Sequence, residues 1–322
     1  MADARTAGGG SKRVVYAALA GNLLIALTKF GAAFWTGSSA MLSEAVHSLV
    51  DTGNEGLLLY GMHRAAQRPD RDHPLGYGRE LYFWSFIVAL LVFALGAGVS
   101  AYQGIAHLRH PEPIEDAVVS YVVLAAAFVF EGFSWVISVR HFRASKGRAS
   151  FLQAFRRSKD PPSFIVLFED SAALLGIVIA AAGTYAAVSL DMPEFDGIAS
   201  ILIGLVLAAT AVALARESKS LLIGEQADRR LREEILAIAG ACDNVVRANG
   251  VLTAQLAPDQ IIAALSLEFA DRLTAVDIEQ QVLDIERRIR AAHPEVVTVF
   301  VKPQTASTFK EVVKERFGED AL

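Results

Sequence analysis

The chain has 322 residues, of which 53% are hydrophobic and only 20% are charged, and its formal net charge is −5. This balance is typical of a polytopic membrane protein, because a soluble domain of that size would expose too much apolar surface to water. The acidic excess lies in residues 217–322, which hold 18 Asp and Glu against 13 Lys and Arg. A nucleic-acid partner is therefore not expected, since no basic surface outweighs these acids.

Six apolar stretches are long enough to cross a lipid bilayer, which takes about 20 helical residues. They lie near residues 14–35, 40–62, 81–106, 118–139, 164–188 and 197–215. We therefore predict an α-helical membrane protein with six transmembrane helices at 14–216, preceded by a tail at 1–13. The first stretch is too long for the apolar part of a signal peptide, so we expect it to remain as a span.

The basic residues alternate between the connections of these spans. Lys and Arg gather before span one, between spans two and three, and between spans four and five. The opposite connections, residues 36–39, 111–116 and 189–196, carry few cations. The positive-inside rule then predicts a multi-pass protein of the cell membrane with both termini in the cytoplasm.

The hydropathy falls after residue 215, and a second pattern begins. It predicts a helix at 228–241, two strands at 245–256 and 260–269 joined by a turn at Pro258 and Asp259, an amphipathic helix at 274–292 and a strand at 296–301. A short helix is expected from Thr305. Residues 217–322 are thus predicted to form a small cytoplasmic α+β domain of αββαβ order.

The second span carries polar residues inside a stretch long enough to lie in lipid. Glu44, His47, Asp51, Asn54 and Glu55 are spaced by 3, 4, 3 and 1 residues. This spacing places them on one stripe of a helix, with His47 and Asp51 one turn apart. Ionisable groups inside a membrane are costly unless they face a polar interior or a cation. An imidazole and a carboxylate presented together are suited to Zn²⁺ and its neighbours in the first transition row.

The fifth span contains a second acidic cluster, Glu169 and Asp170. Counted at 1.5 Å per residue from the membrane faces, Asp170 reaches about the same depth as His47 and Asp51. We predict that His47, Asp51 and Asp170 form a metal site between spans two and five. Glu169 and Asn54 are secondary candidates, because adjacent helical residues point about 100° apart and an intramembrane Asn often bonds a neighbouring helix.

For several of these polar residues, a structural role is an alternative to metal binding. A single intramembrane His is often an interhelical hydrogen bonder, although His47 is accompanied by two carboxylates. In the loop before span three, Asp70 and His73 are weak candidates for a cytoplasmic metal site, and a solvated turn is the favoured interpretation. We expect that the protein is not an enzyme, because the sequence lacks H-E-x-x-H, P-loop lysine and G-x-S-x-G motifs. We also expect that it binds no cofactor.

Three stretches of the sequence form a further pattern: WTGSSAMLSEAVHSLVD at 35–51, HPLGYGR at 73–79 and DGIAS at 196–200. They resemble the cation diffusion facilitators, the family of zinc and manganese efflux transporters. The resemblance extends to the six spans, to Lys29 in the first span and to the αββαβ tail, which in that family is a ferredoxin-like domain. The Glu-Asp pair in span five is similar to a zinc-transporter-like branch of the family.

The resemblance implies a homodimer that exchanges cytosolic metal for protons by alternating access. Val166 stands where the family usually has a His or Asp, so the fourth ligand is left open. The tail has a single His, His293, and is expected to pair two protomers while binding little or no metal.

We therefore expect a divalent transition-metal efflux transporter, with Zn²⁺/H⁺ antiport first. An exporter of Mn²⁺, Fe²⁺ or Co²⁺ is the alternative within this class, because a site rich in oxygen ligands prefers harder ions. The alternative from another class is a membrane metal sensor or scaffold that binds metal without moving it.

Overall fold

A computed structural model describes residues 19, 22–111, 114, 116–146, 155 and 158–318. The predicted tail at 1–13, the first part of the first span and most of the loop between spans four and five lie outside these residues. The chain divides into two compact units between Lys219 and Ser220. Each unit is described by itself.

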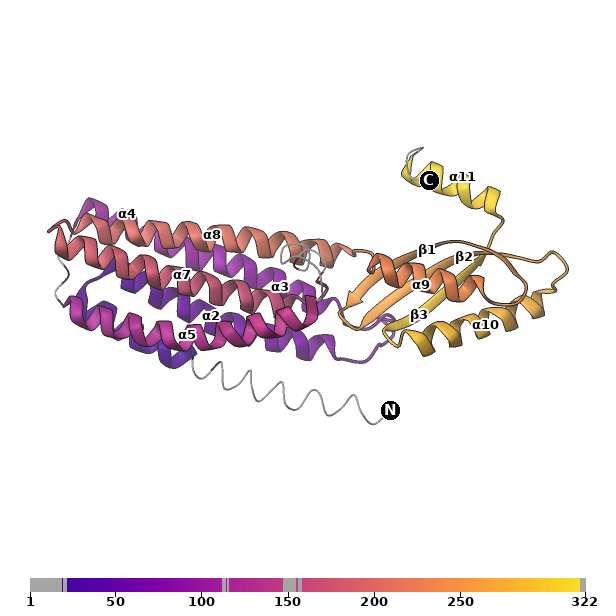
Figure 1. Cartoon of the computed structure of the whole chain (residues 1–322), viewed down its shortest axis with the longest axis horizontal. Coiled ribbons are helices and arrows are strands. Elements are labelled where there is room, and N and C mark those ends of the chain that lie inside the picture. Colours follow the sequence, from indigo (N-terminus) through magenta and orange to yellow (C-terminus); the bar gives the residue numbers. More distant parts are fainter. Residues whose placement is uncertain are drawn as a thin grey trace. The chain divides into compact units, whose positions relative to one another are not determined.

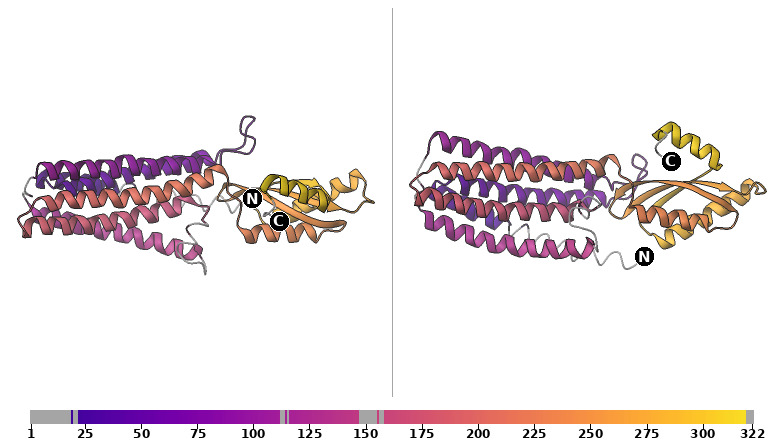
Figure 2. Two further views of the ribbon diagram at one scale, coloured as in Figure 1. Left: turned by 90° about the horizontal axis from the view of Figure 1, so that it is seen from above. Right: turned by 45° about the horizontal axis from the view of Figure 1, so that its top comes forward.

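The first unit is a bundle of long helices that run side by side (Figures 1 and 2). Residues 22–36 are helical. They are followed by α2 (Ser39–Ala65), α3 (Glu80–Leu91), the π-helical segment η1 (Val92–Ala97), α4 (Gly98–Arg109), α5 (Ala117–Lys146), α7 (Pro161–Ser189) and α8 (Glu194–Ile223).

Four helices of the described part are long and apolar enough to cross a membrane. They cover Glu80–Arg109, Ala117–Arg140, Phe164–Ser189 and Glu194–Ile223, and they correspond to the last four predicted spans. The predicted second span coincides with α2, which has 27 residues and would be about 40 Å long at 1.5 Å per residue. Its acidic side chains lower its hydropathy, so its crossing of the membrane stays a prediction, as does that of the first span.

The third span differs from a regular α-helix in its middle. Val92–Ala97 form a π-helical turn between α3 and α4, with glycines at Gly96 and Gly98. Val92 is fully buried and packs with Val50 of α2 and Ala211 of α8. The sequence pattern did not predict this turn, because a π turn adds a residue without breaking the apolar run.

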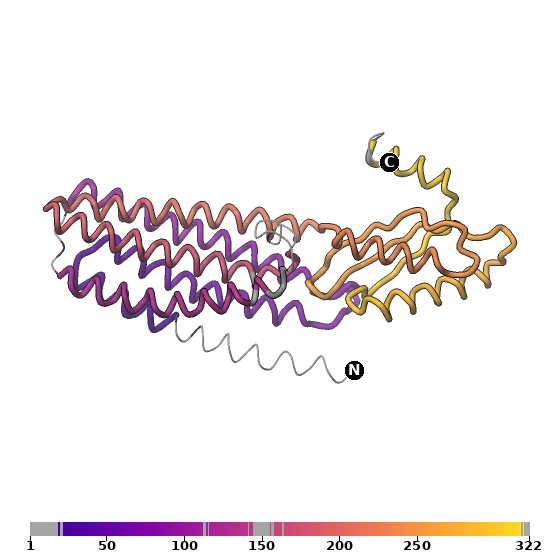
Figure 3. Tube along the Cα trace, viewed as in Figure 1, coloured from indigo at the N-terminus to yellow at the C-terminus, as the bar shows by residue number. Residues whose placement is uncertain are grey.

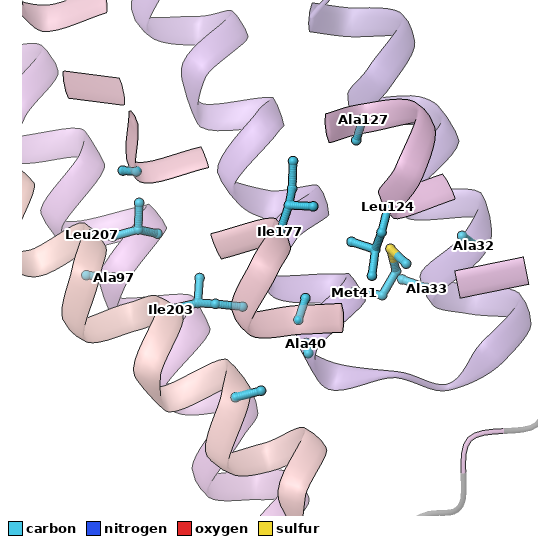
Figure 4. Packing of buried hydrophobic residues seen from close by; sticks show 13 residues of the cluster. Ala32, Ala33, Ala40, Met41, Ala97, Leu124, Ala127, Ile177, Ile203 and Leu207 are labelled. Atoms are coloured by element: carbon cyan, nitrogen blue, oxygen red, sulfur yellow. The ribbon is translucent and has the colours of Figure 1, made fainter. Parts of the chain in front are cut away.

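Small residues form much of the bundle core. The cluster combines Ala32, Ala33, Ala40 and Ala97 with larger side chains such as Met41 and Leu124 (Figure 4). Small side chains let membrane helices approach closely, where dispersion contacts and interhelical hydrogen bonds hold them. The polar groups of α2 therefore lie between tightly packed neighbours.

The second unit is a small α+β fold whose course can be followed in Figure 3. Its elements are α9 (Arg229–Gly240), β1 (Val245–Ala257), β2 (Gln260–Phe269), α10 (Ala275–Ala292), β3 (Val296–Pro303) and α11 (Ala306–Phe317). The predicted αββαβ order and the short last helix are confirmed. The strands lie in the order β1-β2-β3, with β1 antiparallel and β3 parallel to β2.

One face of this sheet carries the core of the unit. Alternate residues of β2, among them Ala263, Leu265 and Leu267, pack with Ile235 of α9 and Ile285 of α10. The helix α10 begins with a capping box between Thr274 and Asp277, which satisfies free backbone N–H groups of its first turn. The local start signal and the period-two burial of β2 explain why the sequence predicted these elements well.

Candidate metal-binding site

The centre of α2 presents a buried imidazole and a buried carboxylate one turn apart. The His47 side chain is 1% exposed and that of Asp51 11% exposed, and His47 Nδ1 lies 3.3 Å from Asp51 Oδ1. Both ring nitrogens of His47 and the Oδ1 atom of Asp51 lack a hydrogen-bond partner among the described residues. Buried polar atoms are normally paired, so His47 and Asp51 are candidates for binding a ligand.

Glu169 of α7 reaches α2 directly. Its Oε1 atom accepts a hydrogen bond of 2.8 Å from Nδ2 of Asn54, which is fully buried one turn beyond Asp51. These two residues were secondary candidates from the sequence. The structure places both of them beside the His47 and Asp51 stripe.

Asp170 is oriented toward α5 instead. Its Oδ2 atom accepts hydrogen bonds from Ser134 Oγ at 3.0 Å and from Ser138 Oγ at 2.9 Å. The difference from Glu169 follows from the rotation of about 100° between adjacent helical residues. In the described part of the chain, no three His, Cys, Asp or Glu side chains are close enough together to hold a metal ion. Asp170 as third ligand therefore stays a prediction.

Further acids surround the predicted site. Glu55, one turn beyond Asp51, accepts a hydrogen bond of 2.8 Å from Asn22 of the first helix, and its Oε2 atom has no hydrogen-bond partner among the described residues. Glu131 of α5 is 5% exposed. Ser134 and Ser138 were not predicted as site residues, although their spacing of one helical turn and their position near the depth of Asp170 are visible in the sequence.

The Asp70 carboxylate is held by hydrogen bonds within the loop before α3. Asp70 Oδ1 accepts hydrogen bonds from the backbone N–H groups of Asp72 and His73, and Oδ2 accepts one of 2.6 Å from the Tyr77 hydroxyl. The Tyr77 hydrogen bond is the main cause that lowers the pKa of the Asp70 carboxyl below its usual value. With both oxygens engaged inside the turn, the solvated-turn interpretation of Asp70 and His73 is favoured over a metal site.

His293 of the second unit follows α10 and lies between two acids. Its Nε2 atom is 3.5 Å from Glu234 Oε2, and its Nδ1 atom is 3.6 Å from Glu295 Oε1. These distances describe weak ion pairs near the surface of the unit when the imidazole is protonated.

Comparisons with known proteins show the family to which the chain is similar. A family model described as the cation efflux transmembrane domain matches residues 15–223. The human proton-coupled zinc antiporter SLC30A9, mitochondrial, is 37% identical over 218 residues, which make up 67% of this chain and 38% of that protein. Metal tolerance protein C4 of Arabidopsis thaliana is 35% identical over 231 residues, or 70% of this chain and 50% of the relative.

A third relative is similar over nearly its full length. The cation-efflux pump FieF of Escherichia coli O127:H6 is 26% identical over 288 residues, which cover 88% of this chain and 89% of that protein. The chain thus spans half or less of the human and plant relatives and most of the bacterial one.

Proposed function

The chain belongs to the cation efflux family, and from this premise we propose that it exports a divalent transition-metal cation, with Zn²⁺ first, in exchange for protons. The observation that carries the proposal is the buried pair of His47 and Asp51, whose open nitrogen and oxygen atoms lie together at the centre of α2. An imidazole and a carboxylate are ordinary ligands of Zn²⁺.

The proposed site joins this pair to a carboxylate of α7. Asp170 is the carboxylate that the family resemblance indicates, and it would have to leave Ser134 and Ser138 to reach the metal. Glu169 is already hydrogen-bonded to Asn54 and stays the secondary candidate together with it. Either choice places the ion between α2 and α7, the two helices whose relative movement would open the site to one side or the other.

Proton exchange follows from the chemistry of these ligands. A metal ion binds a neutral imidazole and ionised carboxylates, so protons and metal compete for the same atoms. Metal bound from the cytosolic side would displace protons, and protons from the other side would release the metal. The human relative is named a proton-coupled zinc antiporter, which supports this choice of mechanism.

The proposal includes the architecture that the sequence predicted. We propose six spans, both termini on the cytoplasmic side of the cell membrane, and a ferredoxin-like cytoplasmic domain that pairs two protomers. The strand order β1-β2-β3 and the separate core of the second unit support the domain assignment.

Pairing of the second unit gives the first prediction. Residues 217–322 alone should form a soluble dimer, because this unit has its own buried core and the family resemblance implies that it joins two protomers. Sedimentation equilibrium at tens of micromolar measures the mass. A monomer at these concentrations would contradict the pairing role.

Metal choice gives the second prediction. In His47→Asp the spacing of one turn to Asp51 is kept, but the proposed site becomes all-oxygen. The ratio of Zn²⁺ to Mn²⁺ flux should therefore fall, since harder ions prefer oxygen ligands. Flux of both metals into proteoliposomes that contain the wild-type protein or the variant measures the ratio. An unchanged ratio would show that His47 does not determine the preference for Zn²⁺ over Mn²⁺.

A further inference from the structure

A buried ion pair lies beside the predicted metal site. Lys29 of the first helix and Glu44 of α2 are both fully buried, and Lys29 Nζ lies 3.1 Å from Glu44 Oε2. Lys29 Nζ also donates a hydrogen bond of 2.8 Å to Ser48 Oγ. A charge at this depth is costly without a partner, so the pair holds the first helix firmly to α2.

The other oxygen of the same carboxylate faces a glycine of α7. A Cβ atom added at Gly176 would overlap with Glu44 Oε1, since it would lie far closer than two such atoms can approach. The Glu44 carboxylate therefore fits against α7 only because residue 176 is a glycine without a side chain. Glu44 Oε1 has no hydrogen-bond partner among the described residues, which leaves one buried lone-pair acceptor free beside α7.

The pair lies on a defined side of the predicted site. Glu44 precedes His47 by three residues, so it is about 4.5 Å nearer to the Ser39 end of α2. At that end Ala40, Met41 and Ser43 are at most 1% exposed. The bundle is thus tightly packed at the end of α2 where Lys29 and Glu44 lie.

A carboxylate that holds an ammonium group can hold a divalent cation in its place. The ammonium group and the divalent cation bind the same carboxylate oxygens, and the divalent cation carries twice the charge of the lysine. Breaking the pair without a replacement leaves two unpaired buried charges, which is strongly unfavourable. A metal ion that moves from His47 toward the Ser39 end would supply that replacement for Glu44.

We propose that Lys29 and Glu44 form an ion-pair gate, in which Lys29 holds the Glu44 carboxylate while the site faces the cytosol and Glu44 becomes a release ligand for the metal when the bundle opens to the other side. This inference rests on the proposed transport function. The gate stays shut without metal, because breaking the pair with no incoming cation leaves two buried charges unpaired. Glu44 is thereby assigned a second role, as the next ligand on the path beyond His47.

Zn²⁺ binding to the detergent-solubilised full chain tests the competition between lysine and metal. In Lys29→Met the Glu44 carboxylate is free, so calorimetry should show Zn²⁺ binding at least about tenfold tighter than in the wild type, on the scale by which neighbouring groups change metal affinity. In Lys29→Met/Glu44→Gln the affinity should return to the wild-type value. An affinity that is unchanged in Lys29→Met would overturn the gate.

Zn²⁺ flux in proteoliposomes separates a gate from a purely structural ion pair. The double variant Lys29→Met/Glu44→Gln contains no unpaired buried charge, so its melting temperature should stay near that of the wild type. If Glu44 is the release ligand, its maximal flux should still fall at least about tenfold, with the Zn²⁺ concentration for half-maximal flux unchanged. Wild-type flux in this variant would show that the pair only holds the helices together and would overturn the proposal.

Gly176→Ala tests the same carboxylate without altering any charge. The new methyl group should push Glu44 away from α7 and lower the maximal flux as the double variant does. Gly53→Ala is the matched control, because an added Cβ at Gly53 of α2 has no atom within 4 Å and should leave the flux unchanged. Equal flux in the two alanine variants would contradict the role of Gly176.

The two proposals fail in different ways. If the wild type bound no Zn²⁺, the proposed function would fall and the gate with it. If the wild type bound and moved Zn²⁺ while the Lys29 and Glu44 variants behaved like it, only the gate would fall.

Discussion

Zn²⁺ flux through Asp51→Ala should fall to the level of protein-free liposomes, while the variant still inserts into the membrane. The physical reason is that Asp51 supplies one of the two open, buried groups at the centre of α2, 3.3 Å from His47. Without Asp51 the proposed site keeps only His47 and the α7 carboxylate, whereas protein sites for Zn²⁺ supply at least three ligands. Asp170→Ala should have the same effect if Asp170 closes the site from α7.

Asp259→Ala is the matched control for this measurement. Asp259 is an exposed carboxylate in the turn between β1 and β2, so its removal takes away the same charge without changing a residue of the first unit. Its flux should equal that of the wild type. Wild-type flux in Asp51→Ala would contradict the proposed site. If flux were lost in Asp51→Ala but normal in Asp170→Ala, the ligand from α7 would be Glu169 instead of Asp170.

The stability of the bundle should fall strongly in Asp196→Ala. Asp196, at the start of α8, is fully buried and binds the first residues of α2. Its Oδ1 atom accepts a hydrogen bond of 2.7 Å from Ser38 Oγ. Its Oδ2 atom accepts bonds from the Ser39 N–H at 2.6 Å, the Ser39 hydroxyl at 2.8 Å and the Ala40 N–H at 3.1 Å.

The expected loss follows from the donors that would be left without an acceptor. Each unsatisfied buried donor costs about 1–3 kcal/mol, and two backbone N–H groups of α2 lose their partner in Asp196→Ala, so the free energy of unfolding should fall by roughly 2–6 kcal/mol. Thermal unfolding in detergent, followed by circular dichroism, measures the change. Asp196→Asn keeps one acceptor oxygen and should lie between the alanine variant and the wild type. A melting temperature equal to that of the wild type in Asp196→Ala would show that water replaces the carboxylate.

The elements were predictable from the sequence wherever a local pattern specifies them. The second unit is the clearest case, since alternation along residues 260–269 and the turn at Pro258 and Asp259 indicate the antiparallel pair β1 and β2. The stripe of α2 was likewise visible, because its spacing alone places His47 and Asp51 one turn apart. Local periodicity acts within one element, and these features need nothing more.

The relations between helices were not predictable in the same way. The sequence shows that Glu169 and Asp170 point in different directions, but not which of them faces α2, because the rotation of α7 is set by the packing of Ala172, Ile177 and Ala180 into the bundle core. The bonds from Asp196 to Ser39 join residues 157 positions apart, and no local signal marks such a contact. The π turn at Val92–Ala97 was hidden for a similar reason, since its residues are apolar whichever turn they form.

The most direct test of the central claim is Zn²⁺ uptake into proteoliposomes containing the wild-type chain, recorded together with the internal pH. Antiport predicts that Zn²⁺ accumulates when the liposome interior is more acidic than the outside, that protons leave as Zn²⁺ enters, and that a protonophore abolishes the accumulation. Protein-free liposomes and Asp51→Ala should show neither flux. A wild-type protein that binds Zn²⁺ in detergent but moves no Zn²⁺ and no protons in this experiment would contradict the account and identify the chain as a membrane metal sensor or scaffold.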